Sequence, residues 1–149
     1  MSPTIIFVPG SWHTTFHAEP LLNVLRKRGY QTICLQQASV GLKSPRPTFT
    51  DDVELIAQAC LGEIKQGRDV MLVLHSIAGI CGSEAVNQII AQGGLENCES
   101  KGRLVRVVLI ASYALPAGMV FDARQYVGPD DPNLIIDVGT MSLSKVLRI

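Results

Sequence analysis

Short apolar runs that alternate with longer helical patterns restrict this chain to an α/β fold. The runs are rich in Val, Ile and Leu, and they are too short for typical helices: Ile5–Val8, Thr32–Leu35, Asp69–Leu74 and Leu104–Ala111. Between them, apolar residues recur at helical spacing and the patterns end at glycine. Strands that alternate with helices form parallel sheets, so we predict a parallel sheet with helices on both faces.

Three helices are expected between these strands. The clearest begins near Phe49, with Thr50 as N-cap and acidic residues in its first turn, and it ends at Gly67. Another is expected over Gly79–Ala91. In the first helix, four apolar residues should lie on one side, before a basic segment and Gly29: Leu21, Leu22, Val24 and Leu25.

Composition indicates one globular domain over residues 1–149, with an irregular extension over 116–149. Hydrophobic residues make up 47% of the chain and charged residues 17%, which is enough apolar material for a core and too little charge for disorder. Thirteen basic residues balance thirteen acidic ones, so nucleic acid is not expected as a partner. No apolar run approaches the roughly 20 residues of a membrane span, and no signal peptide is visible. We expect a cytoplasmic protein without a membrane partner.

The four cysteines are scattered and form no C-x-x-C pair. They lie in or near apolar segments, at Cys34, Cys60, Cys81 and Cys98. This pattern is typical of reduced thiols that serve as small apolar residues. We expect neither a metal site nor a cofactor.

The turn after the third strand carries the strongest functional signal. There the strand runs through His75 into Ser76, and small residues that begin a helix follow. This is the context of a nucleophile elbow, in which a strained turn raises a serine hydroxyl at a helix N-terminus. The positions two before and two after are usually small, but here they are Leu74 and Ala78, and Leu74 is bulky. An ordinary N-cap serine is the alternative interpretation.

Three motifs, in this order, resemble the α/β-hydrolase superfamily. They are VPGSWH at 8–13, LHSIAGICGSEA at 74–85 and ASYALPAG at 111–118. More narrowly, the motifs are similar to those of fungal and bacterial hydrolases related to plant methyl esterases and hydroxynitrile lyases. The resemblance covers the N-terminal part of such enzymes, and it implies a truncated α/β-hydrolase fold that lacks the last strands and the cap.

The resemblance also implies roles for individual residues. Ser76 would be the nucleophile of a carboxylic ester hydrolase. The N–H of Ile77 and one from the Gly10-Ser11-Trp12 turn would form an oxyanion hole, which stabilises the charge that develops on the carbonyl oxygen. The implied substrate is a small or medium ester, lactone or related carbonyl compound, with a role in secondary metabolism.

The histidine base is missing from the expected place. In this superfamily the acid and then the histidine follow the serine, but His13, His17 and His75 all precede Ser76. His13 is the candidate for a substitute base or a substrate contact. We expect His17 at the surface and His75 in packing or a structural hydrogen bond. Asp122 is the candidate acid, or else a solvated loop residue.

These gaps leave other interpretations open. The alternatives are a catalytically inactive remnant of the fold, a binding subunit and an incomplete gene product. A dinucleotide-binding fold is disfavoured, because no G-x-G-x-x-G follows the first strand. The fourth strand would be an exposed sheet edge, which the tail Met141–Ile149, a second copy or a partner should cover.

Overall fold

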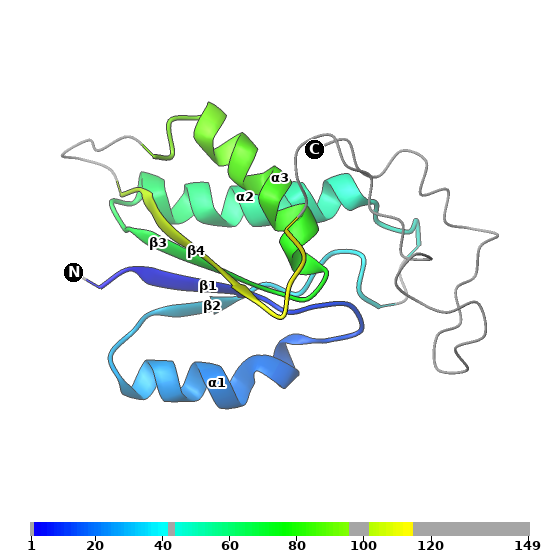
Figure 1. The fold of residues 1–149 in the computed structure, drawn as a ribbon, viewed down its shortest axis with the longest axis horizontal. Helices are drawn as coiled ribbons and strands as arrows, with labels where there is room; N and C mark the ends of the chain where they lie inside the picture. Colours follow the sequence, from blue (N-terminus) through cyan, green and yellow to red (C-terminus); the bar gives the residue numbers. More distant parts are fainter. Residues whose placement is uncertain (1, 42–43, 96–101, 115–149) are drawn as a thin grey trace. The chain divides into compact units, whose positions relative to one another are not determined.

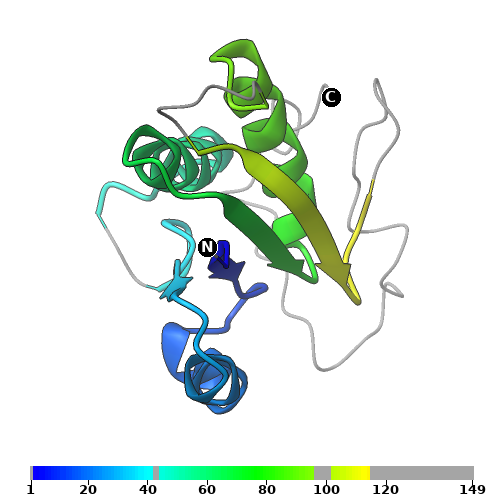
Figure 2. The same ribbon diagram turned by 90° about the vertical axis from the view of Figure 1, so that its left-hand side faces the viewer.

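The structure is a computed structural model that describes residues 2–41, 44–95 and 102–114. Its elements follow the chain in the order β1 (Thr4–Val8), α1 (Thr15–Lys27), β2 (Thr32–Cys34), α2 (Phe49–Lys65), β3 (Val70–His75), α3 (Ala78–Ala91) and β4 (Leu104–Ile110). The four strands form one parallel sheet in the order β2-β1-β3-β4. Figures 1 and 2 show α1 on one face and α2 and α3 on the other, which confirms the predicted fold class.

Several predictions concern residues outside the described part of the chain. The described residues belong to one compact unit, Met1–Ala114. The predicted extension 116–149 lies outside the described residues, and so do Asp122, Cys98 and the tail Met141–Ile149. Among the described helices, none has the length and apolar character needed to cross a bilayer.

The core has two parts, one on each face of the sheet. Ile6 and Leu72 pack with α2 and α3, whereas Ile5, Phe7 and Val73 pack with α1. Successive strand residues point to opposite faces, so a strand covered on both sides must be apolar at every position. Every residue of β1 is buried, which explains why Ile5–Val8 is a continuous apolar run.

The apolar side of α1 is narrower than the sequence indicated. Leu22 is fully buried, but Leu21 and Val24 are 42% and 49% exposed. The residues that contact the sheet are Ala18, Leu22 and Leu25, at the spacing i, i+4 and i+7. The prediction that Leu21 and Val24 share the buried side is therefore wrong, because only one stripe of the helix reaches β1 and β2.

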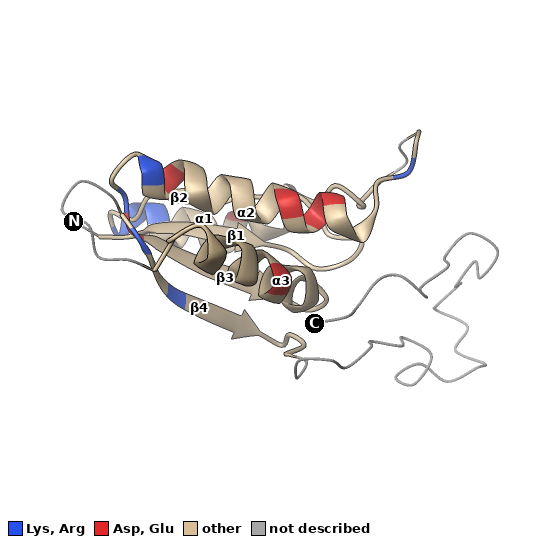
Figure 3. Ribbon diagram, turned by 90° about the horizontal axis from the view of Figure 1, so that it is seen from above, with Lys and Arg blue, Asp and Glu red and all other residues tan. Residues whose placement is uncertain are grey.

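The start of α2 also differs from the prediction. The N-cap is Thr48, not Thr50: its hydroxyl accepts from the Asp51 N–H, and the Asp51 carboxylate accepts from the Thr48 N–H at 2.6 Å. This capping box needs a partner three residues after the cap, and Asp51 satisfies that spacing from Thr48. Figure 3 shows acidic residues at the start of α2 and a basic one, Lys65, in its last turn, as the helix dipole favours.

The end of α2 is joined to the start of the sheet by an ion pair. Arg68 donates to both carboxylate oxygens of Glu63, at 2.5 and 2.7 Å, and the Thr4 hydroxyl donates to the same carboxylate at 3.1 Å. The hydrogen bonds from Arg68 hold the pKa of Glu63 below its ordinary value of 4.5. A lowered pKa in the folded state stabilises the fold above the unfolded pKa, and this contribution is lost as the pH falls through the folded value.

We therefore expect Glu63→Gln to lower the free energy of unfolding by about 0.5–1 kcal/mol at pH 7, as for a partly exposed ion pair. The difference between wild type and variant should shrink as the pH falls below 4.5 and through the lowered pKa of Glu63, because the wild-type carboxylate then becomes protonated. Urea denaturation at several pH values measures both proteins. A difference that does not change with pH would contradict this assignment.

The strand β4 forms an edge of the described sheet. Within the described residues it pairs with β3 alone, over the register Val70–Leu104 to His75–Ile110. Four of its apolar side chains are between 39% and 42% exposed: Val105, Val107, Leu109 and Ile110. That the tail Met141–Ile149, a second copy or a partner covers this edge stays a prediction.

Candidate active site

Three turns meet at the carboxyl ends of adjacent parallel strands. They follow β1 at Gly10, β3 at Ser76 and β4 at Ala111. In open α/β sheets, ligands bind at the carboxyl ends of the strands, because the turns there are not part of the ladder and present their polar groups. The sheet therefore brings together the first and second motifs and the start of the third.

Ser76 occupies a strained turn between β3 and α3. Its φ is 57°, a left-handed conformation that is uncommon outside glycine. Its N–H donates to the Ile110 carbonyl at 3.1 Å, which fixes the turn to the end of β4. An N-cap serine would have extended backbone and would bond to the helix, but the N-cap of α3 is Ile77. The backbone of Ser76 therefore has the strained turn that the elbow interpretation predicts, whereas the alternative fails because Ser76 is not the N-cap of α3.

Gly10 lies directly against Ser76. A Cβ atom at Gly10 would come within 2.7 Å of the Ser76 Cβ and 3.2 Å of its hydroxyl oxygen. The turn after β1 can approach the serine this closely because Gly10 has no side chain. This contact gives the glycine in the first motif a physical role beside the proposed nucleophile.

The N–H of Gly10 is already engaged. It donates to Nδ1 of His75 at 3.3 Å, which is the structural hydrogen bond expected for His75. The described residues offer no hydrogen-bond acceptor to the N–H groups of Ser11, Trp12 and Ile77. Of the predicted oxyanion donors, Gly10 must therefore act by leaving space rather than by donating. Trp12 turns the chain with a φ of 61°, and its side chain is 77% exposed.

The three histidines are close together beside this turn. The ring centroids of His13 and His75 are 5.5 Å apart and those of His13 and His17 are 5.0 Å apart, in edge-to-face contact. Nδ1 of His13 lies 2.8 Å from the Ser11 carbonyl oxygen, which can only accept, so Nδ1 carries the proton and neutral His13 has its lone pair on Nε2. Within the described residues, none of the three is hydrogen-bonded to the Ser76 hydroxyl.

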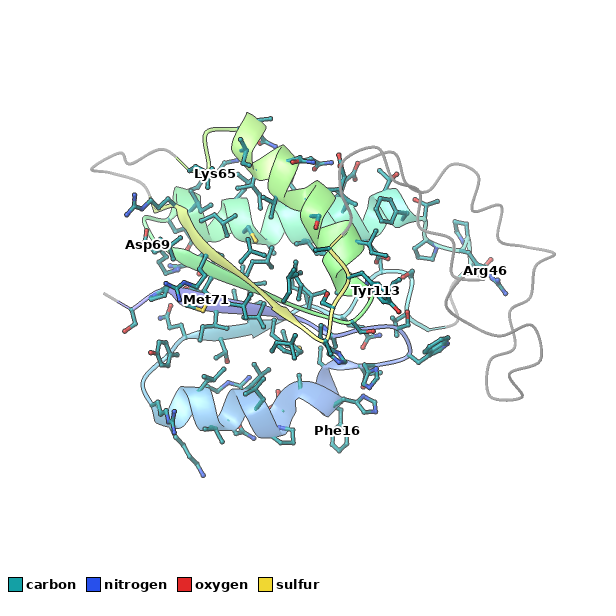
Figure 4. All side chains as sticks on the ribbon, viewed as in Figure 1. Phe16, Arg46, Lys65, Asp69, Met71 and Tyr113 are labelled. Carbon is teal, nitrogen blue, oxygen red and sulfur yellow. The ribbon has the colours of Figure 1, made fainter. Side chains whose placement is uncertain are left out.

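His17 and the neighbouring aromatic residue are at the surface. His17 lies in the first turn of α1, where its Nδ1 accepts from the Thr14 N–H at 3.0 Å. It is exposed, as the sequence indicated. Figure 4 shows Phe16 pointing away from the sheet, and its side chain is 79% exposed.

The bulky side chain of Leu74 packs against a residue that the sequence analysis missed. Leu74 is fully buried, and a Cβ atom at Gly82 would collide with its Cδ1. The space that Leu74 needs is thus provided by a glycine in the interior of α3, not by residue 78. Gly82 therefore accommodates the bulky Leu74 side chain at a position that is usually small. The signal in the sequence was the glycine at position 82.

No charged side chain belongs to the turns that form the site. The segments 9–14, 75–83 and 110–114 contain no Asp, Glu, Lys or Arg.

The thiol of Cys81 on α3 is buried, which raises its pKa to about 12 and keeps it protonated. Cys60 is likewise buried and its pKa is raised to about 12, so both behave as small apolar residues, as predicted. Within the part of the chain that is described, no group of His, Cys, Asp or Glu is placed to hold a metal ion.

Ser112, in the turn after β4, is a second residue that the sequence analysis missed. Its hydroxyl donates to the Ser76 carbonyl at 2.6 Å. The third motif contains Ser112, so the signal was present, but nothing in the spacing alone connects it with a serine 36 residues earlier. Only the pairing of β3 with β4 brings the two together.

The comparisons with known proteins agree with this geometry. The sequence matches the alpha/beta hydrolase family over residues 5–145. It is also similar to the alpha/beta hydrolase nvfD of Aspergillus novofumigatus (strain IBT 16806), with 35% identity over 118 residues, which is 79% of this chain. The chain spans about half the length of that relative, 46%. A family match over nearly all of the sequence, together with the strand–serine–helix turn, places the chain in the alpha/beta hydrolase family.

Proposed function

We propose that this chain carries the nucleophile and the oxyanion hole of a serine hydrolase that acts on carboxylic esters. The observation that supports it most is Ser76 itself, which sits at a φ of 57° between strand and helix with Gly10 against its hydroxyl. A protein does not keep a non-glycine residue in this conformation without compensating contacts, and such residues are concentrated at active sites.

The proposed chemistry is acyl transfer. The Ser76 hydroxyl oxygen forms a bond to the substrate carbonyl carbon, its proton passes to a base, and the carbonyl electron pair moves onto oxygen. The N–H groups of Ile77 and of Ser11 or Trp12 then stabilise that oxyanion, and each such donor is worth about 10²–10³ in rate. The alcohol leaves with a proton from the base, and water releases the acid.

The substrate proposed for Ser76 is a small or medium ester, lactone or related carbonyl compound of secondary metabolism. This part of the proposal rests on the family resemblance, because a fold does not determine a substrate. The uncharged turns around Ser76 suit an apolar carbonyl compound better than an anionic one, since they offer no cation to pair with it.

The proposed reaction requires a base that takes the proton of the Ser76 hydroxyl. His13 is our candidate among the described residues, because its Nε2 lone pair is left available by the bond from Nδ1 to the Ser11 carbonyl. Asp122 remains the candidate acid. Loss of the base from a triad lowers turnover by about 10⁶, so hydrolysis by Ser76 without a base would be very slow.

A second candidate function is a catalytically inactive member of the family that binds a ligand or completes a larger assembly. The observation that favours it is that, within the described residues, no histidine is hydrogen-bonded to the Ser76 hydroxyl, while Nδ1 of His75 is occupied by Gly10. On this proposal the exposed edge of β4 would be covered by a second copy or a partner.

The test is intact mass spectrometry of the folded protein after exposure to a fluorophosphonate. In this reaction the Ser76 oxygen displaces fluoride at phosphorus and the hydroxyl proton goes to the base. We expect one adduct on the wild type and none on Ser76→Ala, with Ser83→Ala as a control that keeps the nucleophile. Absence of an adduct on the folded wild type would overturn the hydrolase proposal and favour the inactive protein.

A further inference from the structure

We propose that Ser112 is a positioning residue that aims the Ile77 N–H into the oxyanion hole. This inference rests on the proposed function of Ser76. Ser112 does not touch the reacting atoms, since its hydroxyl is bonded to the backbone of the elbow. It acts through the peptide group that joins Ser76 to Ile77.

Among the described residues, three donors hold the Ser76 carbonyl. The Gly79 N–H donates at 3.2 Å across three residues, a tight turn that is common at the start of a helix. The other two donors come from the turn after β4: the Ser112 hydroxyl at 2.6 Å and the Tyr113 N–H at 3.3 Å. The shortest of the three bonds is therefore the one from the side chain of Ser112. Figure 4 shows Tyr113 beside the start of α3.

The planarity of the peptide bond connects this carbonyl to the oxyanion hole. The Ser76 C=O and the Ile77 N–H belong to one planar trans peptide, so they point in opposite directions. Donors that fix the direction of the carbonyl must also fix the direction of the N–H. Ser112 thus determines where the Ile77 N–H points, although the two residues share no bond.

The packing around Gly79 makes this arrangement specific. A Cβ atom at Gly79 would collide with the Ser112 hydroxyl oxygen and with the Tyr113 carbonyl oxygen. Because Gly79 has no side chain, the turn after β4 can pack directly against the elbow. Ala111 turns the chain into this position with a φ of 41°, a second left-handed residue in the site. Strained residues on both sides of one hydrogen bond indicate that the bond is maintained against a conformational cost.

The chain provides a matched control for the loss of this hydrogen bond. The hydroxyl of Ser83 also donates to a backbone carbonyl at 2.6 Å, that of Gly79, and it is also partly buried. Ser83→Ala and Ser112→Ala therefore remove equivalent bonds, but only the second bond reaches the peptide of Ser76 and Ile77. Ser112→Thr keeps the hydroxyl and serves as the conservative variant.

The experiment measures fluorophosphonate labelling of these folded proteins at several reagent concentrations. We expect Ser112→Ala to lower the limiting rate on the order of tenfold, the effect of one hydrogen bond, with an unchanged half-saturating concentration. Ser112→Thr should recover most of the rate, and Ser83→Ala should retain it. A Ser112→Ala rate within about twofold of Ser83→Ala overturns the inference. If Ser112→Ala does not fold, Ser112→Cys, a weaker donor, replaces it.

Amide hydrogen exchange separates this inference from the proposed function. If the wild type is not labelled, the hydrolase proposal fails, and the same proteins are compared by the exchange of the Gly79 and Tyr113 amides. Faster exchange in Ser112→Ala than in Ser83→Ala would still support Ser112 as the residue that holds the Ser76 carbonyl. Equal exchange in the two variants would overturn that role.

Discussion

Gly82→Ala is expected to lower the free energy of unfolding by about 1–3 kcal/mol, the usual effect of overpacking a core. The added Cβ would collide with the side chain of Leu74, which is fully buried and lies two residues before Ser76. Alanine is otherwise the better helix former, so a loss of stability here cannot come from helix propensity. Urea denaturation measures the change.

Gly62→Ala is the matched control for this prediction. Gly62 lies inside α2, as Gly82 lies inside α3, but a Cβ atom at Gly62 would meet no neighbouring atom within 4 Å. We expect Gly62→Ala to raise stability by about 0.5–1 kcal/mol, because only the backbone entropy changes. Opposite signs for the two variants would identify the contact with Leu74 as the cause.

A double-mutant cycle tests the pairing directly. Leu74→Ala alone should cost about 2–5 kcal/mol, because it leaves a cavity between sheet and helix. In Leu74→Ala with Gly82→Ala, the new methyl group enters the space that the leucine leaves. The double variant should therefore be more stable than the sum of the two single changes predicts. Additive changes would show that the two sites do not share this space.

The strands and the elbow could be predicted from the sequence because they depend on local patterns. A strand buried on both faces must be apolar throughout, and this is visible in Ile5–Val8 without any knowledge of its neighbours. The serine between a strand and a helix is likewise a local pattern. The cap of α2 was misplaced by two residues, since both Thr48 and Thr50 precede acidic residues and only Thr48 has Asp51 at the right spacing.

The contacts between strands could not be predicted in this way. The bond from Ser112 to the Ser76 carbonyl and the space that Gly82 gives Leu74 depend on how elements pack, not on the spacing of residues. The same holds for the Gly10 N–H, which the sequence analysis grouped with the oxyanion donors and the structure pairs with His75. Each of these concerns the backbone near Ser76, where small shifts decide which groups face a substrate.

Gly10→Ala is expected to slow fluorophosphonate labelling of Ser76 by about 10²–10³, the effect of losing one oxyanion donor. A Cβ atom within 2.7 Å of the Ser76 Cβ is closer than two such atoms can lie, so the turn after β1 must withdraw. It would carry the N–H groups of Ser11 and Trp12 with it. It would also break the bond from the Gly10 N–H to His75, which leaves the ring of His75 without this partner.

Two measurements separate this local change from a loss of the fold. Trp12 is the only tryptophan of the chain and lies in the turn that should move, so its fluorescence reports the displacement even if the wild type is not labelled. Circular dichroism should stay that of the wild type, because Gly10 follows β1 and takes no part in the described backbone pairing of the strands. Unchanged fluorescence together with an unchanged labelling rate would contradict the close packing of Gly10 on Ser76. A shifted spectrum with slow labelling would identify the turn after β1 as the part of the site that orients the oxyanion.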